Sequence, residues 1–122
     1  REGMSVTRFT INDPTTWYQA DHQDLFVADV LDEHNSGTMS VGFARYAKGA
    51  WNDWTLAHDE VIIVTKGHFA VQSSEGVKRA KAGEVLFLTQ GTKLVYRADE
   101  DTELVYVTYP RWADAREPKS AA

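Results

Sequence analysis

The segment AHDEVIIVTKG, residues 57–67, decides the fold of this chain. It places two ionisable side chains, His58 and Glu60, at the start of an apolar run that ends at Gly67. The density of β-branched residues predicts a strand, and glycine suits a tight turn after it. Because side chains alternate across a strand, His58 and Glu60 are expected on the same face.

Similar segments recur along the chain, with glycine or Asx residues between them. No window places apolar residues at helical spacing over three turns. We therefore predict strands over Leu25–Leu31, Met39–Ala47, Glu60–Lys66, His68–Ser73, Lys78–Ala82, Glu84–Thr89, Lys93–Ala98 and Glu103–Tyr109. The clearest hairpin joins 68–73 to 77–82 through Ser74-Glu75-Gly76. Strands at such short, regular spacing are typical of an all-β sandwich or barrel.

The length of 122 residues and the 43% hydrophobic content predict one compact domain. We expect an N-terminal extension over 1–24, the β-barrel over 25–112 and a C-terminal tail over 113–122, where Pro118 and the small terminal residues argue against a core role.

Charge and composition exclude several classes of function. The net charge is −5 and no basic cluster is present, which argues against a nucleic-acid partner. No apolar run approaches the roughly 18 residues of a membrane span, and no signal pattern opens the chain. A cytoplasmic protein is expected. The absence of cysteine leaves only His and carboxylate side chains as metal ligands.

Two glycine-bounded motifs resemble those of the cupins. Glu60 and Gly67 match the end of the first cupin motif, and the stretch from Gly83 to Gly91 matches the second. The resemblance implies a single-domain cupin, a double-stranded β-helix or jelly-roll barrel, with Glu60 pointing into the barrel.

The metal histidines of a typical cupin are missing. Depending on the gap before Glu60, their two upstream positions hold Asp53 and Thr55 or Trp54 and Leu56. The position of the third is Leu94. We therefore expect no bound metal cofactor.

A closer resemblance accounts for this pattern. The segments GFARYAKGAWNDWTLAHDEVIIVTKGHFAV and AKAGEVLFLTQGTKLVY are similar to the cupin domain of the ethanolamine-utilisation protein Q group, which also lacks the metal histidines. That group more usually has tyrosine at the position of His58. An acetate-kinase-type activity is associated with it. This sequence shows no glycine-rich phosphate loop and no Lys/Arg clamp for a nucleotide, so the activity is not transferred.

His58 and Glu60 are the candidate catalytic residues. An imidazole beside a carboxylate can act as an acid–base pair near neutral pH, or the two groups can merely satisfy each other. A divalent metal at His58 and Glu60 is the alternative use of the pair. It would need a third ligand, for which Asp53, His68 and His22 are the candidates.

Aromatic and charged residues near the pair are candidates for binding a substrate. An aromatic lining suits an apolar or cationic organic ligand, although each ring alone is also explained by core packing. Arg45 would contact an anion if it points inward and is otherwise a surface residue. The candidate substrate-binding residues are Trp51, Asp53, Trp54, Tyr96, Tyr106 and Arg45.

Three functions remain open: a metal-independent lyase, isomerase or hydrolase using Glu60 and His58, a non-catalytic module that binds a small molecule, and a metallo-cupin with altered ligands. A homodimer is expected by analogy with small cupins, either through sheet packing or through addition of a strand such as Leu25–Leu31 to a partner sheet.

Overall fold

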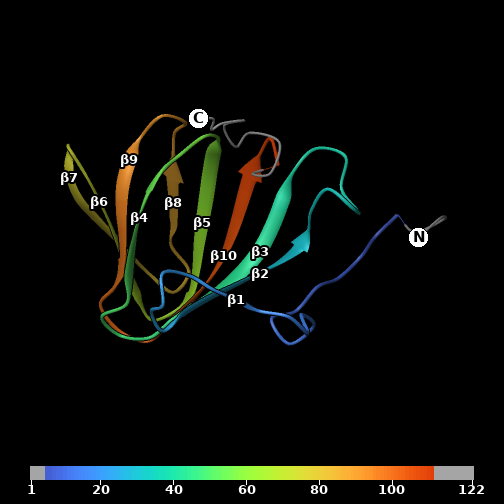
Figure 1. Ribbon diagram of the computed structural model, residues 1–122, viewed down its shortest axis with the longest axis horizontal. Coiled ribbons are helices and arrows are strands. Elements are labelled where there is room, and N and C mark those ends of the chain that lie inside the picture. The colour runs from blue at the N-terminus through green and yellow to red at the C-terminus, as the bar shows by residue number, and fades with distance from the viewer. Residues whose placement is uncertain (1–4, 112–122) are drawn as a thin grey trace.

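A computed structural model describes residues 5–111, which form ten strands and no helix (Figure 1). No helix in this part of the chain could cross a membrane. The strands are β1 (Tyr18–Gln19), β2 (Leu25–Leu31), β3 (Ser40–Tyr46), β4 (Trp51–Thr55), β5 (Asp59–Lys66), β6 (His68–Ser73), β7 (Gly76–Lys81), β8 (Val85–Leu88), β9 (Lys93–Ala98) and β10 (Thr102–Tyr109).

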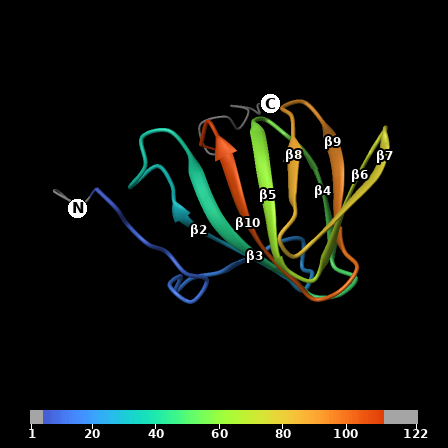
Figure 2. The same ribbon diagram turned by 180° about the vertical axis from the view of Figure 1, so that it is seen from behind.

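The strands make two antiparallel sheets that face each other. The six-stranded sheet has the order β1-β2-β3-β10-β5-β8, and the four-stranded sheet has the order β4-β9-β6-β7. The sheets lie close at the bottom of the views in Figures 1 and 2 and splay apart at the top, where β10 ends and β5 begins. The predicted all-β, jelly-roll architecture is confirmed.

All eight predicted strands are present, and two further strands were missed. β4 contains Asn52 and Asp53, which disfavour strands, but all five of its residues pair with β9. β1 is a two-residue strand on β2, inside the segment predicted as an N-terminal extension. The predicted tail, 113–122, lies outside the described residues.

Two glycines fix the turns on either side of β6. Gly67 has φ +87°, and a β-carbon there would collide with the backbone of Asp101. Gly76 has φ +113° and closes the β6–β7 hairpin opposite Ser73. Both backbone conformations are readily adopted only by glycine. The hairpin predicted from the sequence is thereby confirmed.

The hydrophobic core fills the space between the sheets. In β3 buried and partly buried residues alternate strictly, with Ala44 and Tyr46 turned inward and Phe43 and Arg45 outward. Fully buried side chains from both sheets meet there, among them Leu25, Leu56, Val64, Phe69, Leu94 and Leu104. Tyr46 and Phe69 make an edge-on ring contact at 4.9 Å between centroids.

The outer faces of the two sheets differ sharply. On the six-stranded sheet two adjacent cross-strand rows are entirely apolar. One row is Val41, Val107, Val61 and Phe87, and the other is Phe43, Val105, Ile63 and Val85. We call these eight residues the apolar outer face. On the four-stranded sheet the outward rows are mixed, and one of them is Trp51, Arg97, Ala70 and Arg79.

Candidate functional site

Glu60 lies on the inner face of β5 near the open end of the barrel. Its register partners are Thr108 on β10 and Leu88 on β8, both buried. The phenol of Tyr96, from β9 of the opposite sheet, donates a hydrogen bond of 2.6 Å to the carboxylate of Glu60. Glu60 keeps partial exposure, so the interior at this point is open to solvent. The inward orientation of Glu60 and Tyr96 agrees with the sequence analysis.

The environment of Glu60 holds its carboxyl group close to half-ionised at neutral pH. Burial raises its pKa from 4.5 to about 7, and the hydrogen bond from Tyr96 opposes this rise without cancelling it. Burial and the Glu60 charge in turn raise the pKa of Tyr96, so the phenol stays protonated and donates. Among residues 5–111 no lysine or arginine forms an ion pair with Glu60.

A second carboxylate–tyrosine pair lies on the same inner wall. Tyr106, one inward position from Thr108 on β10, donates a hydrogen bond of 2.5 Å to Asp29 on β2. The ring of Tyr106 crosses the space above Gly42, where any β-carbon would overlap it. Burial and the nearby Asp29 raise the pKa of Tyr106. Glycine on β3 is therefore what lets Tyr106 reach Asp29.

Tyr46 and Asn52 complete the polar cluster. Tyr46, at the end of β3, donates a 2.8 Å hydrogen bond to Asn52 of β4. Burial is the main cause of the raised pKa of Tyr46, Tyr96 and Tyr106, and the charge of Glu60 raises the pKa of each phenol further. We call Asp29, Tyr46, Asn52, Glu60, Tyr96 and Tyr106 the inner polar cluster.

His58 does not form the predicted pair with Glu60. Its side chain is 3% exposed, and its Nδ1 has no hydrogen-bond partner among the described residues. Burial lowers its pKa below the usual value of 6.5, which keeps the imidazole neutral near pH 7. Glu60 bonds to Tyr96 instead, because that phenol reaches it from the opposite sheet. The Oγ1 of Thr108, the neighbour of Glu60, is a second buried polar atom without a partner in this part of the chain.

The candidate substrate-binding residues on β4 lie on two different faces of the sheet. Its register places Asn52 and Trp54 opposite Tyr96 and Leu94, both buried on the inner face of β9. Trp54 is 43% exposed on this edge strand. Trp51 and Asp53 alternate to the outer face, so the structure does not bring them together with Glu60.

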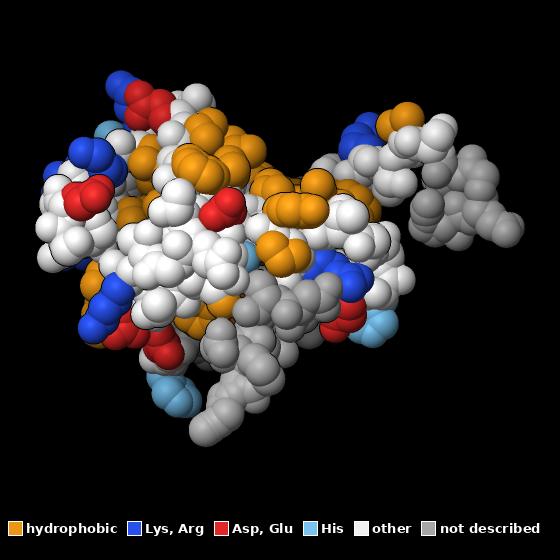
Figure 3. Space-filling model, turned by 90° about the horizontal axis from the view of Figure 1, so that it is seen from above, with side chains coloured by type: hydrophobic (Ala, Val, Ile, Leu, Met, Phe, Trp, Pro, Cys, Tyr) orange, Lys and Arg blue, Asp and Glu red, His pale blue; other side chains and the backbone are white. Residues whose placement is uncertain are grey.

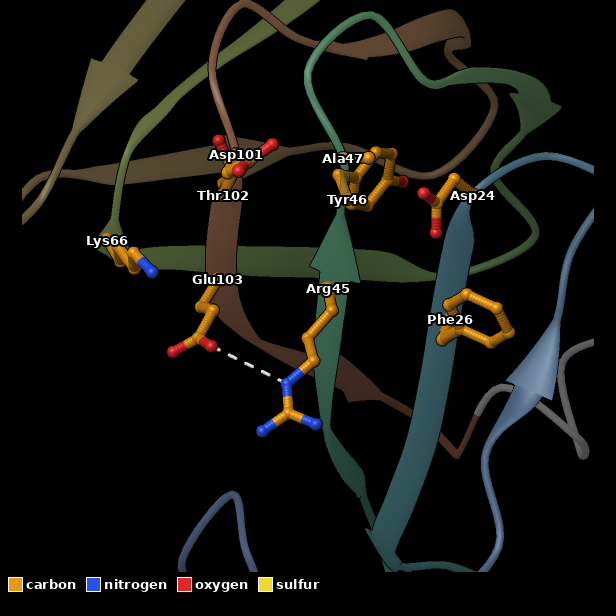
Figure 4. A pocket seen from close by; sticks show the side chains of 9 residues that line it. All are labelled: Asp24, Phe26, Arg45, Tyr46, Ala47, Lys66, Asp101, Thr102 and Glu103. Atoms are coloured by element: carbon orange, nitrogen blue, oxygen red, sulfur yellow. Dashed lines mark ion pairs between the residues drawn. The ribbon is translucent and has the colours of Figure 1, made fainter.

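Arg45 also points away from the inner polar cluster. Its guanidinium lies 3.5 Å from the Glu103 carboxylate and 4.7 Å from the centroid of the Trp17 ring. It lines an open groove of about 270 Å³ with Phe26, Lys66 and Glu103, at the end of the barrel away from Glu60 (Figure 4). The inward orientation considered for Arg45 is wrong, because the alternation of β3 turns it outward with Phe43.

The residues at the usual cupin ligand positions do not fit a metal ion. The inward-facing set is Trp54 with the buried Leu56 and Leu94, none of which has a ligand atom, so Glu60 is the only donor left. Among residues 5–111, one group of three acidic or histidine side chains has its ligand atoms gathered within 4.8 Å, and it is Asp32, Glu33 and His34 in the β2–β3 loop. The third ligands considered for a site at His58 and Glu60 do not join that pair.

Sequence reasoning missed three members of the inner polar cluster: Asp29, Tyr46 and Asn52. Asp29 stands opposite Gly42, Tyr46 opposite Leu25 and Thr102, and Asn52 opposite Tyr96, and these neighbours become readable only once the register is known. Asp29 stands opposite Gly42 across β2 and β3, so a glycine facing a carboxylate was the available clue.

Comparison with known proteins agrees with these features. The profile of the ethanolamine utilisation protein EutQ family matches residues 5–114. The EutQ protein of Salmonella typhimurium, described as an acetate kinase, is 29% identical over 84 residues, which are 69% of this chain and 36% of that protein. The acetate kinase EutQ of Clostridioides difficile is 29% identical over 75% of this chain and 55% of its own length. The chain thus spans about a third to a half of these relatives.

Solved structures give the same assignment. The Clostridium difficile EutQ structure superposes with a TM-score of 0.70 at 26% identity, covering 76% of this chain and 68% of that one. A protein of unknown function from Rhizobium leguminosarum superposes with a TM-score of 0.73 at 28% identity, covering 88% and 99%. An RmlC-like cupin from Shewanella frigidimarina, at 18% identity and a TM-score of 0.73 over 89% and 96%, shares the fold. This chain is a cupin barrel without the metal histidines, and the EutQ profile matches it over most of its length. The chain therefore belongs to the EutQ family.

Proposed function

We propose that this chain binds a small, neutral or cationic organic molecule inside the cupin barrel, and that Glu60 exchanges a proton with it. The observation that carries the proposal is the Glu60 carboxyl group, whose pKa is raised to about 7 and which has no cation paired with it among the described residues. A carboxyl group that titrates near the working pH serves well as a general acid or base.

The surroundings of Glu60 indicate the kind of ligand. Asp29 and Glu60 offer acceptor oxygens, Tyr96 and Tyr106 hold those oxygens in place, and Trp54 adds an aromatic wall. An ammonium or hydroxyl group on the ligand would find acceptors and phenols here. Among the residues described, Oγ1 of Thr108, the register neighbour of Glu60, is a buried polar atom without a partner, which adds to the polar character of this end of the barrel.

The same surroundings do not favour phosphoryl transfer. A kinase neutralises the phosphates of its substrate with lysine, arginine or a metal ion. The cluster around Glu60 instead gathers carboxylates and phenols. Because the chain spans only part of the EutQ relatives, their acetate kinase activity is not extended to it.

The proposal is tested by titrating the protein with a matched set of small amines, alcohols and carboxylates and following the amide and indole NMR signals. Amines and alcohols should shift the signals of Trp54 and of residues beside Glu60, and a carboxylate of the same size should not. Selective binding of the carboxylate would contradict the proposal.

Glu60→Gln separates an enzyme from a carrier. The glutamine keeps the shape and the hydrogen bond to Tyr96 but cannot exchange a proton. If the chain is an enzyme, Glu60→Gln should no longer turn over a ligand found in the titration. The variant should still bind the neutral alcohols of the set. Turnover that survives Glu60→Gln would contradict the catalytic part of the proposal.

A further inference from the structure

Basic side chains gather on the four-stranded sheet, although the chain as a whole has a net charge of −5. The strands of the six-stranded sheet carry four acidic and two basic residues. The strands of the four-stranded sheet carry one acidic residue, Asp53, and five exposed basic residues, which are Lys78, Arg79, Lys81, Lys93 and Arg97. Figure 3, in which this sheet lies on the left, shows Lys and Arg side chains there with acidic side chains between them.

Arg79 on β7 and Arg97 on β9 converge on one carboxylate. Both side chains lie in the outward row that begins with Trp51. The Nε of Arg79 donates a 3.2 Å hydrogen bond to Asp99, and the Nε of Arg97 lies 3.7 Å from the other oxygen of that carboxylate. Asp99 is itself bound to β6, because its backbone N–H donates to a carbonyl of that strand. The two guanidiniums are thus held side by side, although they come from separate strands.

One carboxylate compensates only one of these two positive charges. Within residues 5–111 neither guanidinium forms an ion pair with a second acidic group, and the side chains of Arg79 and Arg97 are 60% and 49% exposed. Exposed ion pairs add little to the stability of a fold. Contact through Nε leaves the terminal N–H groups of each guanidinium for an external carboxylate, whose geometry they match. Trp51, 47% exposed and opposite Arg97, adds apolar surface beside them.

We propose that the outer face of the four-stranded sheet binds an extended segment of a partner protein that carries acidic and apolar side chains. Carboxylates of the segment accept hydrogen bonds from Arg79 and Arg97, and an apolar side chain packs on Trp51. Clusters of arginine recognise acidic motifs, and tryptophan and arginine are enriched among the residues that dominate binding at interfaces. The inference concerns the outside of the barrel and is independent of any ligand near Glu60.

The length of the row and its charges favour such a segment over other anions. Three strand spacings of about 4.8 Å place Trp51 about 14 Å from Arg79. That is too long for one small anion to bridge, whereas about four residues of an extended chain span it. A nucleic-acid strand would bring a phosphate at every step to a face that also carries Asp53 and Asp99. Spaced carboxylates with apolar side chains between them match the face better.

The test measures binding of a fluorescent, end-blocked peptide of roughly eight residues, long enough to cross the row, by anisotropy. The peptide contains glutamate, leucine and serine, and a second peptide has glutamine in place of every glutamate. We expect the glutamate peptide to bind at low salt with a Kd below about 1 mM and to bind more weakly as salt is added. The glutamine peptide should not bind. Labelled oligothymidine of the same length should bind more weakly than the glutamate peptide.

Two pairs of substitutions locate the binding. Arg79→Gln with Arg97→Gln should raise the Kd of the glutamate peptide at least roughly tenfold, because the charge-assisted hydrogen bonds are lost. The matched control is Arg45→Gln with Lys66→Gln, which removes the same charge from the outer face of the six-stranded sheet. The control should change the Kd less than about twofold, because only the long-range field is altered.

Trp51→Ala tests the apolar contact and should raise the Kd at least roughly fivefold. The substituted side chains are exposed, so the circular dichroism of every variant should match the wild type. Three results would each overturn the proposal: a glutamate peptide that does not bind at about 1 mM, an equal loss of binding in the two pairs of substitutions, and tighter binding of oligothymidine than of the glutamate peptide.

Discussion

Both faces of the six-stranded sheet depart from the usual arrangement, in which apolar residues face the core and polar residues face water. The inner face carries Asp29, Glu60 and Tyr106 near its open end, while the outer face carries eight apolar residues in two rows. Burying a polar group lowers the stability of the fold unless the group is hydrogen-bonded. An apolar group left in water contributes none of the stabilisation that its burial would give. We propose that a bound ligand compensates for the polar groups on the inner face.

The inner face of the six-stranded sheet itself has two different halves. Towards the closed end Ala44, Val64 and Leu104 pack as an ordinary core. Towards the open end Asp29, Glu60 and Tyr106 replace that core, and the two carboxyl groups accept hydrogen bonds from Tyr106 and Tyr96.

Gly42→Ala should damage the inner face most. Its β-carbon would overlap the ring of Tyr106 and approach the carbonyl oxygen of Ala28 at 2.6 Å, so the ring must leave Asp29. We expect a loss of about 3 kcal/mol in the free energy of unfolding, in the range for overpacking a core. Urea unfolding measures it. Gly37→Ala is the control, because nothing lies within 4 Å of its added carbon. Equal stability of the two variants would show that Tyr106 is not held as described.

Glu60→Gln should stabilise the protein at neutral and alkaline pH. Between pH 4.5 and about 7 the unfolded chain has lost the Glu60 proton while the folded chain keeps it, so stability falls as pH rises through this window. The difference in pKa corresponds to at most about 3 kcal/mol, which the variant recovers above pH 7. Unfolding curves at several pH values measure this. A pH dependence that is unchanged in the variant would contradict the raised pKa.

His58→Leu should change the pH dependence of stability in the opposite direction to Glu60→Gln. Because the folded pKa of His58 lies below 6.5, the unfolded chain binds a proton that the folded chain refuses, and stability is lost as pH falls below that value. The variant should flatten this loss and, by removing a buried nitrogen without a partner, gain on the order of 1 kcal/mol at neutral pH. Thermal melts at pH 5 and 7 compare it with His34→Leu in the exposed β2–β3 loop. Equal changes in both variants would contradict the account of His58.

Arg45→Ala should have the smallest effect. The guanidinium stacks on Trp17 and faces Glu103 at a half-exposed site, and such contacts are worth roughly 0.5–1 kcal/mol. Urea unfolding should show a loss no greater than that, and the pH dependence assigned to Glu60 should not change. Arg97→Ala on the four-stranded sheet is the control for a surface arginine. A change in the Glu60 titration would show that Arg45 communicates with the interior after all.

Much of the fold could be predicted from the sequence, because alternation and glycine turns are local signals. The strand over Lys93–Ala98 needed only its own residues. β4 was missed because its Asn and Asp resemble a loop until pairing with β9 is known. The outward position of Trp51 and Asp53 follows from that pairing and could not be read without it.

The candidate site could be predicted only in part. Glu60 followed from its strand and from the cupin motif, and Tyr96 followed from its alternation with Leu94. The partner of Glu60 could not be predicted, since Tyr96 lies 36 residues away on the other sheet. The spacing in the sequence suggested His58 as the partner of Glu60. Hydrogen bonds depend on which side chains are neighbours in space, and these are not readable from the spacing. Asp29 was hidden because its partner Tyr106 comes 77 residues later.

The titration of Glu60 tests the central claim most directly. In protein labelled with ¹³C at the glutamate side chains, the Cδ signal that disappears in Glu60→Gln belongs to Glu60, and its shift against pH gives the pKa of that carboxyl group. The account predicts a midpoint near 7, from burial opposed by the Tyr96 hydrogen bond. A midpoint near 4.5, the ordinary value, would contradict the claim that Glu60 is an acid–base group within the barrel.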